Sequence, residues 1–89
     1  MEKETIIIRF YSERDGKEFD LDIPLFISAN ELIIALNEAY NLGIDVSNIK
    51  KCYLQAENPV ALLRGNKTLQ QFGLRNGSRI YYTNVLGRK

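Results

Sequence analysis

The chain has 89 residues, with twelve Lys and Arg against eleven Asp and Glu, one Cys, and neither His nor Trp. Without histidine it has no imidazole for a Ser-His-Asp or Cys-His relay and no zinc site built on His ligands. One cysteine cannot close an internal disulfide, which favours a reducing compartment. The composition therefore excludes most common enzyme classes, and we expect a protein that is not an enzyme and has no cofactor or metal site.

The length fits one domain over residues 1–89, with flexible ends at 1–4 and 87–89. A net charge of +1 provides no global field to attract nucleic acid or an anionic membrane. No apolar run approaches the roughly 20 residues that a membrane span needs, and the first residues lack the apolar segment of a signal peptide. We expect a cytoplasmic protein that binds no nucleic acid and does not insert into a membrane.

The first half of the chain predicts a β-hairpin. Residues 5–11 are rich in β-branched and aromatic types, and residues 12–16 have the composition of a turn. Residues 18–23 alternate strictly between two sets, with Phe19, Leu21 and Ile23 on one side and Glu18, Asp20 and Asp22 on the other. This alternation is typical of a half-buried strand, which Pro24 should end because proline cannot donate to the ladder.

A helix is predicted over 29–40. Ser28 and Glu31 have the spacing of a capping box, in which each side chain accepts from the backbone of the other. The apolar residues at helical spacing that should share the buried face are Ala29, Leu32, Ile33, Leu36, Ala39 and Tyr40. Gly43 is placed to end the helix. Ile34 falls on the opposite side and should be exposed.

The remaining elements follow in a fixed order. We expect strands over 51–56, 60–63 and 79–85, turns at 57–59 and 76–77, and a capping-box turn of helix at 68–71. The order is that of an α+β, ubiquitin-like β-grasp fold. In this fold one main helix packs on one face of a mixed four- to five-stranded sheet, and a short helical turn precedes the last strand. The other face is left to solvent or a partner.

Parts of the sequence resemble ubiquitin and one family of ubiquitin-fold proteins. Residues 67–74, continuing through Asn76 and Gly77 to 80–82, resemble ubiquitin. Over nearly the whole chain, and most clearly at 19–21, 29–40 and 73–78, the sequence resembles the YukD-like (EsaB-like) ubiquitin-fold proteins of bacterial type VII (WXG100, ESX-like) secretion. This resemblance implies a small cytosolic accessory protein. It also implies protein partners in the secretion system, whose other parts include a membrane-bound FtsK/SpoIIIE-type ATPase, and it carries over no catalytic residue.

Strand alternation selects the candidate site. Residues of the first, third and last strands that point away from the helix should form one surface, and Tyr and Arg are enriched at interface hot spots. The candidate partner-binding residues are Ile7, Arg9, Tyr11, Lys51, Tyr53, Arg79 and Tyr81, with Ile34 as a separate candidate on the helix. The alternative is a set of ordinary cross-strand pairs, with Arg9 meeting Asp20 or Asp22.

Two other functions remain open from the sequence. One is a ubiquitin-like modifier or sulfur carrier that is activated at its C-terminus, although the printed sequence ends Gly87-Arg88-Lys89 without a Gly-Gly pair and would need trimming after Gly87. The other is a β-grasp adaptor unrelated to secretion. Cys52 should point inward as a small core residue, not act as a nucleophile. The sequence does not predict the oligomeric state.

Overall fold

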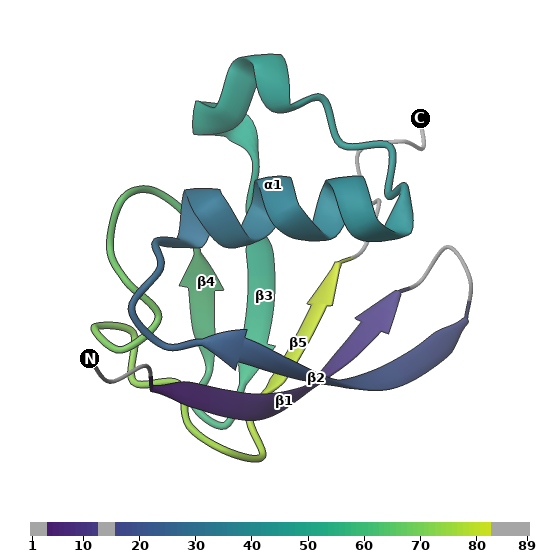
Figure 1. The fold of residues 1–89 in the computed structure, drawn as a ribbon. Helices are drawn as coiled ribbons and strands as arrows, with labels where there is room; N and C mark the ends of the chain where they lie inside the picture. The colour runs from purple at the N-terminus through teal and green to yellow at the C-terminus, as the bar shows by residue number, and fades with distance from the viewer. Residues whose placement is uncertain (1–3, 13–15, 83–89) are drawn as a thin grey trace.

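The computed structural model describes residues 4–12 and 16–82. Their elements are β1 (Thr5–Ser12), β2 (Lys17–Pro24), α1 (Ala29–Tyr40), the 3-10 helix η1 (Val46–Lys51), β3 (Leu54–Glu57), β4 (Ala61–Leu63) and β5 (Arg79–Tyr82). The strands form one five-stranded sheet in the order β2-β1-β5-β3-β4. The β1–β5 pair is parallel and the other neighbours are antiparallel. Figure 1 shows α1 lying across one face of this sheet, which confirms the predicted α+β β-grasp fold.

The hairpin of β1 and β2 follows the predicted alternation. In β1, Ile6, Ile8 and Phe10 are buried against the helix side, while Ile7 and Arg9 are exposed on the other side. The two strands pair in register from Thr5 opposite Pro24 to Ser12 opposite Lys17. Because side chains on a strand alternate between the two faces, this register places the acidic residues of β2 on the face that α1 leaves open.

Helix α1 begins at the predicted capping box. The Glu31 N–H donates to Ser28 Oγ at 3.1 Å, and the Ser28 N–H donates to Glu31 Oε1 at 2.8 Å. The helix ends at Tyr40, as predicted, but the residue that caps it is Asn41, with φ 55° in the left-handed region, and not Gly43. Asparagine tolerates this conformation because its short polar side chain can bond locally.

The predicted burial of Ala39 is wrong. The last turn of α1 reaches the sheet through Tyr40, whose ring lies 5.2 Å from that of Phe19 and 5.8 Å from that of Phe10. Because Tyr40 covers this end of the core, Ala39 remains exposed on the outer side of the helix. The fully buried residues of α1 are Ala29, Leu32, Ile33 and Leu36.

The third strand starts three residues later than predicted. Residues 51–53 do not join the sheet, because Lys51 ends η1 and the Cys52 N–H donates to Ile49 O at 3.0 Å. Asp45 begins the same turn by accepting from the Ser47 N–H at 3.2 Å. These local hydrogen bonds use the backbone groups that a strand ladder would need, so β3 begins at Leu54.

The segment between β4 and β5 contains the second predicted capping box. The Gln71 N–H donates to Thr68 Oγ1 at 3.2 Å, and the Thr68 N–H donates to Gln71 Oε1 at 2.9 Å. The Phe72 N–H also donates to Thr68 O at 3.2 Å, which closes a single helical turn. The last strand forms over Arg79–Tyr82, and the rest of its predicted range, 83–85, lies outside the described residues, as do the expected flexible ends except Glu4.

Candidate functional site

The open face of the sheet has two rows of side chains that cross the strands. We call one the aromatic row. It consists of four residues, each directly opposite the next on the neighbouring strand: Tyr11 of β1, Tyr81 of β5, Gln55 of β3 and Leu62 of β4. We call the other the charge row: Asp20 of β2, Arg9 of β1, Arg79 of β5 and Glu57 of β3 are likewise in register. Residues that are directly opposite share a face, so both rows belong to one surface.

The aromatic row combines half-buried rings with an exposed aliphatic side chain. Tyr11 and Tyr81 are half-buried, and Leu62 is 45% exposed. The Arg79 guanidinium carbon lies 5.7 Å from the ring centroid of Tyr11 and 5.6 Å from that of Tyr81. A guanidinium group near the face of an aromatic ring is attracted by the ring's quadrupole. Arg79 therefore holds both tyrosines in place.

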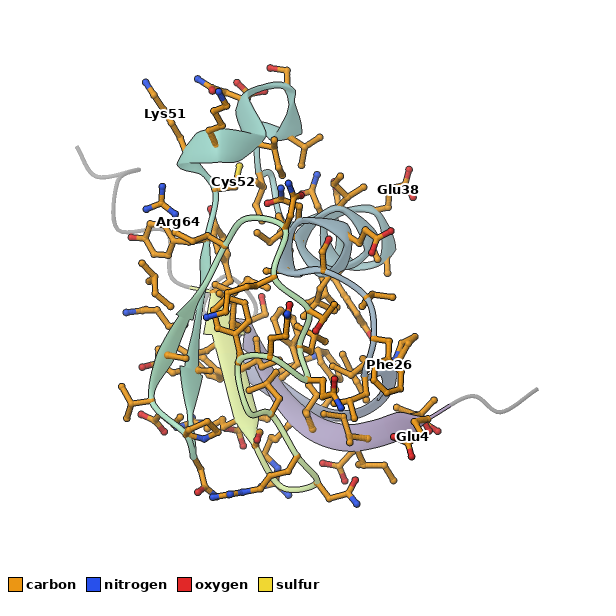
Figure 2. The ribbon with its side chains drawn as sticks, turned by 90° about the vertical axis from the view of Figure 1, so that its left-hand side faces the viewer. Glu4, Phe26, Glu38, Lys51, Cys52 and Arg64 are labelled. Atoms are coloured by element: carbon orange, nitrogen blue, oxygen red, sulfur yellow. The ribbon has the colours of Figure 1, made fainter. Side chains whose placement is uncertain are left out.

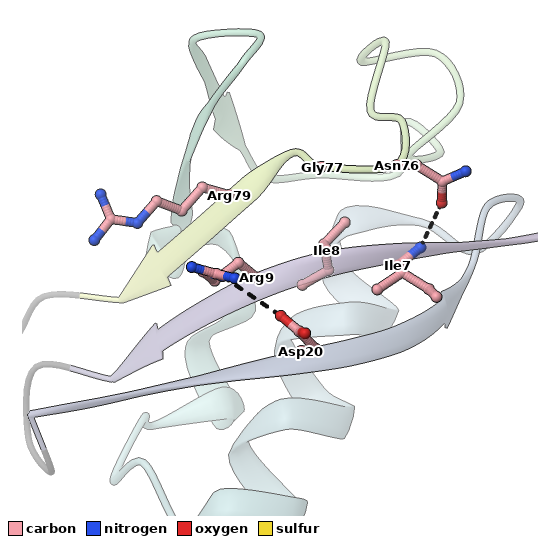
Figure 3. A pocket seen from close by; sticks show the side chains of 7 residues that line it. All are labelled: Ile7, Ile8, Arg9, Asp20, Asn76, Gly77 and Arg79. Atoms are coloured by element: carbon pink, nitrogen blue, oxygen red, sulfur yellow. Dashed lines mark hydrogen bonds and ion pairs between the residues drawn. The ribbon is translucent and has the colours of Figure 1, made fainter.

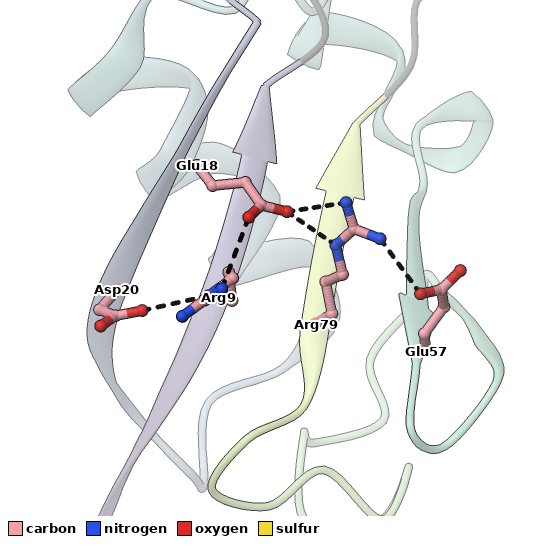
Figure 4. Close-up of polar contacts among 5 residues, drawn as sticks. All are labelled: Arg9, Glu18, Asp20, Glu57 and Arg79. Atoms are coloured by element: carbon pink, nitrogen blue, oxygen red, sulfur yellow. Dashed lines mark hydrogen bonds and ion pairs between the residues drawn. The ribbon is translucent and has the colours of Figure 1, made fainter.

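Arg79 is also the centre of an ion-pair network, drawn in Figure 4. Its Nη2 lies 2.7 Å from Glu18 Oε2, and its Nη1 lies 3.3 Å from Glu57 Oε1. The hydrogen bond to Glu18 is the main reason that the pKa of Arg79 is raised above its ordinary value. Arg9 approaches Glu18 at 3.6 Å and Asp20 at 3.4 Å. Because these side chains are partly exposed, the network orders the surface more than it stabilises the fold.

The candidate residues predicted for this face include arginine and lysine but no acid, and the charges found there differ. Both arginines are paired with carboxylates, and the Arg9 contact with Asp20 is the cross-strand pair that the alternative interpretation expected. The four acidic residues on the open face are Glu18, Asp20, Asp22 and Glu57, against the two cations Arg9 and Arg79. The described face is therefore acidic overall, with a tyrosine-rich centre.

The predicted site residues are only partly brought together. Ile7, Arg9, Tyr11, Arg79 and Tyr81 share the open face. Two others lie outside the strands: Lys51 ends η1 and projects from that end of the molecule (Figure 2), and Tyr53 is half-buried between η1 and β3. The prediction omitted Glu18, Gln55, Glu57 and Leu62. Strand alternation was a usable signal for Glu18, Gln55 and Leu62, whereas Glu57 fell in a predicted turn and lies at the end of β3 in the structure.

A shallow groove lies beside the charge row. We call it the Ile7 groove; it has a volume of about 560 Å³ and is lined by Ile7, Ile8, Arg9, Asp20, Asn76, Gly77 and Arg79 (Figure 3). Asn76 and Gly77 are fixed against β1, because the Ile7 N–H donates to Asn76 Oδ1 at 2.8 Å and the Gly77 N–H donates to Ile7 O at 2.9 Å. The loop before β5 thus forms a well-defined rim.

Ile34 lies on α1, away from the open face. It is 42% exposed, as its helical position predicts. Single exposed aliphatic residues are common on protein surfaces. A partner contact at Ile34 stays a prediction.

Cys52 is buried, as predicted, and its thiol is held by backbone oxygens. Its Sγ lies 3.5 Å from Asp45 O and 3.6 Å from Asn48 O. Burial, followed by the nearby Asp45 carboxylate, raises the pKa of this thiol. Since the thiolate is the reactive form, Cys52 is a weak nucleophile in the folded protein.

We expect Cys52 to react with a thiol reagent such as DTNB at pH 8 at least about tenfold more slowly in the folded protein than in 6 M guanidinium chloride, because folding buries the sulfur and lowers the thiolate fraction. The reaction is followed by absorbance. Equal rates in the two conditions would show that the thiol is accessible.

Comparison with known proteins decides the family. Residues 6–81 match the family model of YukD, described as a protein of the WXG100 protein secretion system (Wss). The chain belongs to the YukD family. The match spans the described part of both rows and of the Ile7 groove, and it confirms the resemblance inferred from the sequence. No curated protein matches the chain.

Solved structures show the same fold as this YukD-family chain. The ubiquitin-like domain from tubulin-binding cofactor B has 22% identity and a TM-score of 0.77, covering 99% of this chain and 98% of that one. The C-terminal ubiquitin-like domain of mouse tubulin-specific chaperone e has 13% identity and a TM-score of 0.71, covering 91% and 87%. A ubiquitin-like domain from Arabidopsis thaliana has 15% identity and a TM-score of 0.68, covering 97% and 84%. At these identities the likeness concerns the fold alone.

The YukD family is associated with secretion, so a membrane contact is a natural question. In residues 4–12 and 16–82, no helix reaches the length and hydropathy of a membrane span.

Proposed function

We propose that this chain is a non-enzymatic accessory or regulatory protein of a type VII-like secretion system, which acts in the cytosol by docking its open sheet face onto a larger component. The observation that carries the proposal is the aromatic row. Tyr11 and Tyr81 are adjacent, and Gln55 separates them from Leu62, so the row is a strip of aromatic, amide and aliphatic side chains on the face that α1 does not cover. Such a strip is typical of the centre of a protein interface.

The side chains of the strip are already held in place, which supports docking over a merely structural role. The Arg79 contacts to Glu18, Glu57 and the two tyrosine rings fix the side chains before a partner arrives. Fewer side chains then have to be ordered on binding, which lowers the entropic cost of association. The acidic surroundings of the strip provide a polar rim that can select one partner by charge.

The family supports a partner within the secretion machinery. We propose the cytosolic part of the membrane-bound FtsK/SpoIIIE-type ATPase, or another secretion component, as the docking partner. A catalytic role has little support in the chain, which has no histidine and whose one cysteine is buried with a raised thiol pKa.

The test is capture of partners from native cells by tagged protein, followed by mass spectrometry. The double variant Tyr11→Ser and Tyr81→Ser should lose at least about tenfold of the captured secretion component, because it removes both rings of the aromatic row. The matched control is the double variant Ala35→Ser and Glu38→Ser, which changes two exposed positions of α1 and should capture as wild type does. Circular dichroism checks that both variants fold. Full retention by the tyrosine variant would overturn the docking proposal.

A further inference from the structure

The Ile7 groove lies on the open face but outside the aromatic row. Ile7 is 52% exposed there, although its backbone is fixed on both sides by Asn76 and Gly77. A large aliphatic side chain in a groove with a fixed rim provides a site for one apolar side chain of a partner. Beside it, Asp22 of β2 lies directly opposite Ile7 in the hairpin register.

The carboxylates of β2 leave negative charge at this groove. Asp22 has no ion pair or side-chain hydrogen bond within the described part of the chain. Asp20 lines the groove and meets Arg9 at 3.4 Å, but Arg9 is shared with Glu18, and the Asp20 side chain is 67% exposed. Arg9 and Arg79 also line the groove, but both already meet carboxylates, namely Glu18, Asp20 and Glu57. With Asp22 beside the groove, the surrounding face has four carboxylates against two cations.

We propose that the Ile7 groove binds a basic segment of the partner protein, with an aliphatic side chain against Ile7 and a lysine or arginine at Asp22 and Asp20. This inference rests on the proposed function, because the groove is part of the same open face. The ammonium or guanidinium group supplies the positively charged partner that Asp22 lacks. Hydrogen bonds between a cation and a carboxylate are stronger than those between neutral groups. The fixed rim positions the apolar contact beside it.

Other occupants fit the charges less well. Nucleic acid would bring phosphates to a wall that already has an excess of carboxylates. A second copy of the chain, paired about a twofold axis centred on the charge row, would place Arg9 or Arg79 against an arginine of its partner, or carboxylate against carboxylate. A basic segment of another protein avoids both repulsions.

The experiment uses the full chain labelled with ¹⁵N and two capped six-residue peptides, one alternating isoleucine with lysine and the other alternating isoleucine with glutamate. The lysine peptide should shift the amide signals of Ile7, Asp22 and Gly77 in a saturable manner, and the glutamate peptide should not. Asp22→Asn should weaken binding of the lysine peptide at least about fivefold, because it removes the unpaired carboxylate and leaves the shape nearly unchanged. Glu38→Gln, the same change on α1, should leave it unaltered.

Several results would overturn the proposal. These are equal shifts with both peptides, shifts that fall outside the groove, or an affinity that Asp22→Asn does not change. Shifts at Ile7 that depend on protein concentration alone would identify a second copy as the occupant, and shifts with single-stranded oligothymidine would identify nucleic acid. If the peptides fail while the Tyr11 and Tyr81 variant still loses its secretion component, docking stands and only the assigned groove chemistry is wrong.

Discussion

Replacing Ile33 with Ala is expected to lower the free energy of unfolding by about 2 to 5 kcal/mol. Its side chain has no exposed surface and lies in the core between α1 and the sheet, so truncation removes buried methyl groups and leaves a cavity. A domain of this size has only about 5 to 10 kcal/mol of stability, so the loss is a large fraction of the total. Urea unfolding followed by circular dichroism measures it from the midpoint and slope.

The adjacent residue provides the control. Ile34 has the same side chain in the same helix but is 42% exposed. Ile34→Ala should change the free energy of unfolding by no more than about 0.5 kcal/mol, because it creates no cavity and alanine favours the helix. Similar losses at both positions would mean that the face of α1 turned toward the sheet has been assigned wrongly.

The same unfolding measurement is needed to interpret the binding experiments. A variant that loses its partner because the core is damaged would resemble one that loses a docking contact. Tyr11 and Tyr81 are half-buried on the open face, so their variants need the same unfolding measurement as Ile33→Ala. A binding loss is assigned to docking only when stability is close to that of wild type.

Local signals predicted the hairpin and α1 well. The strict alternation of 18–23 allows one face assignment, and the capping box of Ser28 and Glu31 fixes where the helix begins. The start of β3 was less clear, because 46–51 has no strong helical period. Asp45 followed by Ser47 was the available signal, since a capping aspartate two residues before a serine favours a turn over a strand.

The sequence predicted on which face of the sheet the site residues lie, but not which side chains they contact. Alternation alone places Arg9 and Arg79 outward, as found. The contacts of Arg79 with Glu18 and Glu57 join residues that are 61 and 22 positions apart, and they depend on the register between strands that the whole fold sets. A single sequence contains no direct signal for that register, so the two arginines were selected as site residues without the carboxylates that neutralise them.

Ser78→Ala is expected to lower the free energy of unfolding by about 1 to 3 kcal/mol. Ser78 is fully buried immediately before β5, where its Oγ donates to Asn58 O at 2.7 Å and accepts from the Arg75 N–H at 3.0 Å. Alanine leaves both backbone groups without these bonds. The loop that they hold is next to Arg79, so the same variant should also disturb the charge row.

A second buried serine provides the control, because its hydroxyl has no hydrogen bond to lose within the described part of the chain. Ser12 is also fully buried, but its Oγ has no hydrogen-bond partner among the residues that the structure describes. Ser12→Ala removes a desolvated hydroxyl without breaking a bond, so it should be at least as stable as wild type and up to about 1 kcal/mol more stable. Urea unfolding of the two variants measures the difference. Equal destabilisation by both would mean that the hydrogen bonds of Ser78 add nothing beyond the volume that its side chain fills.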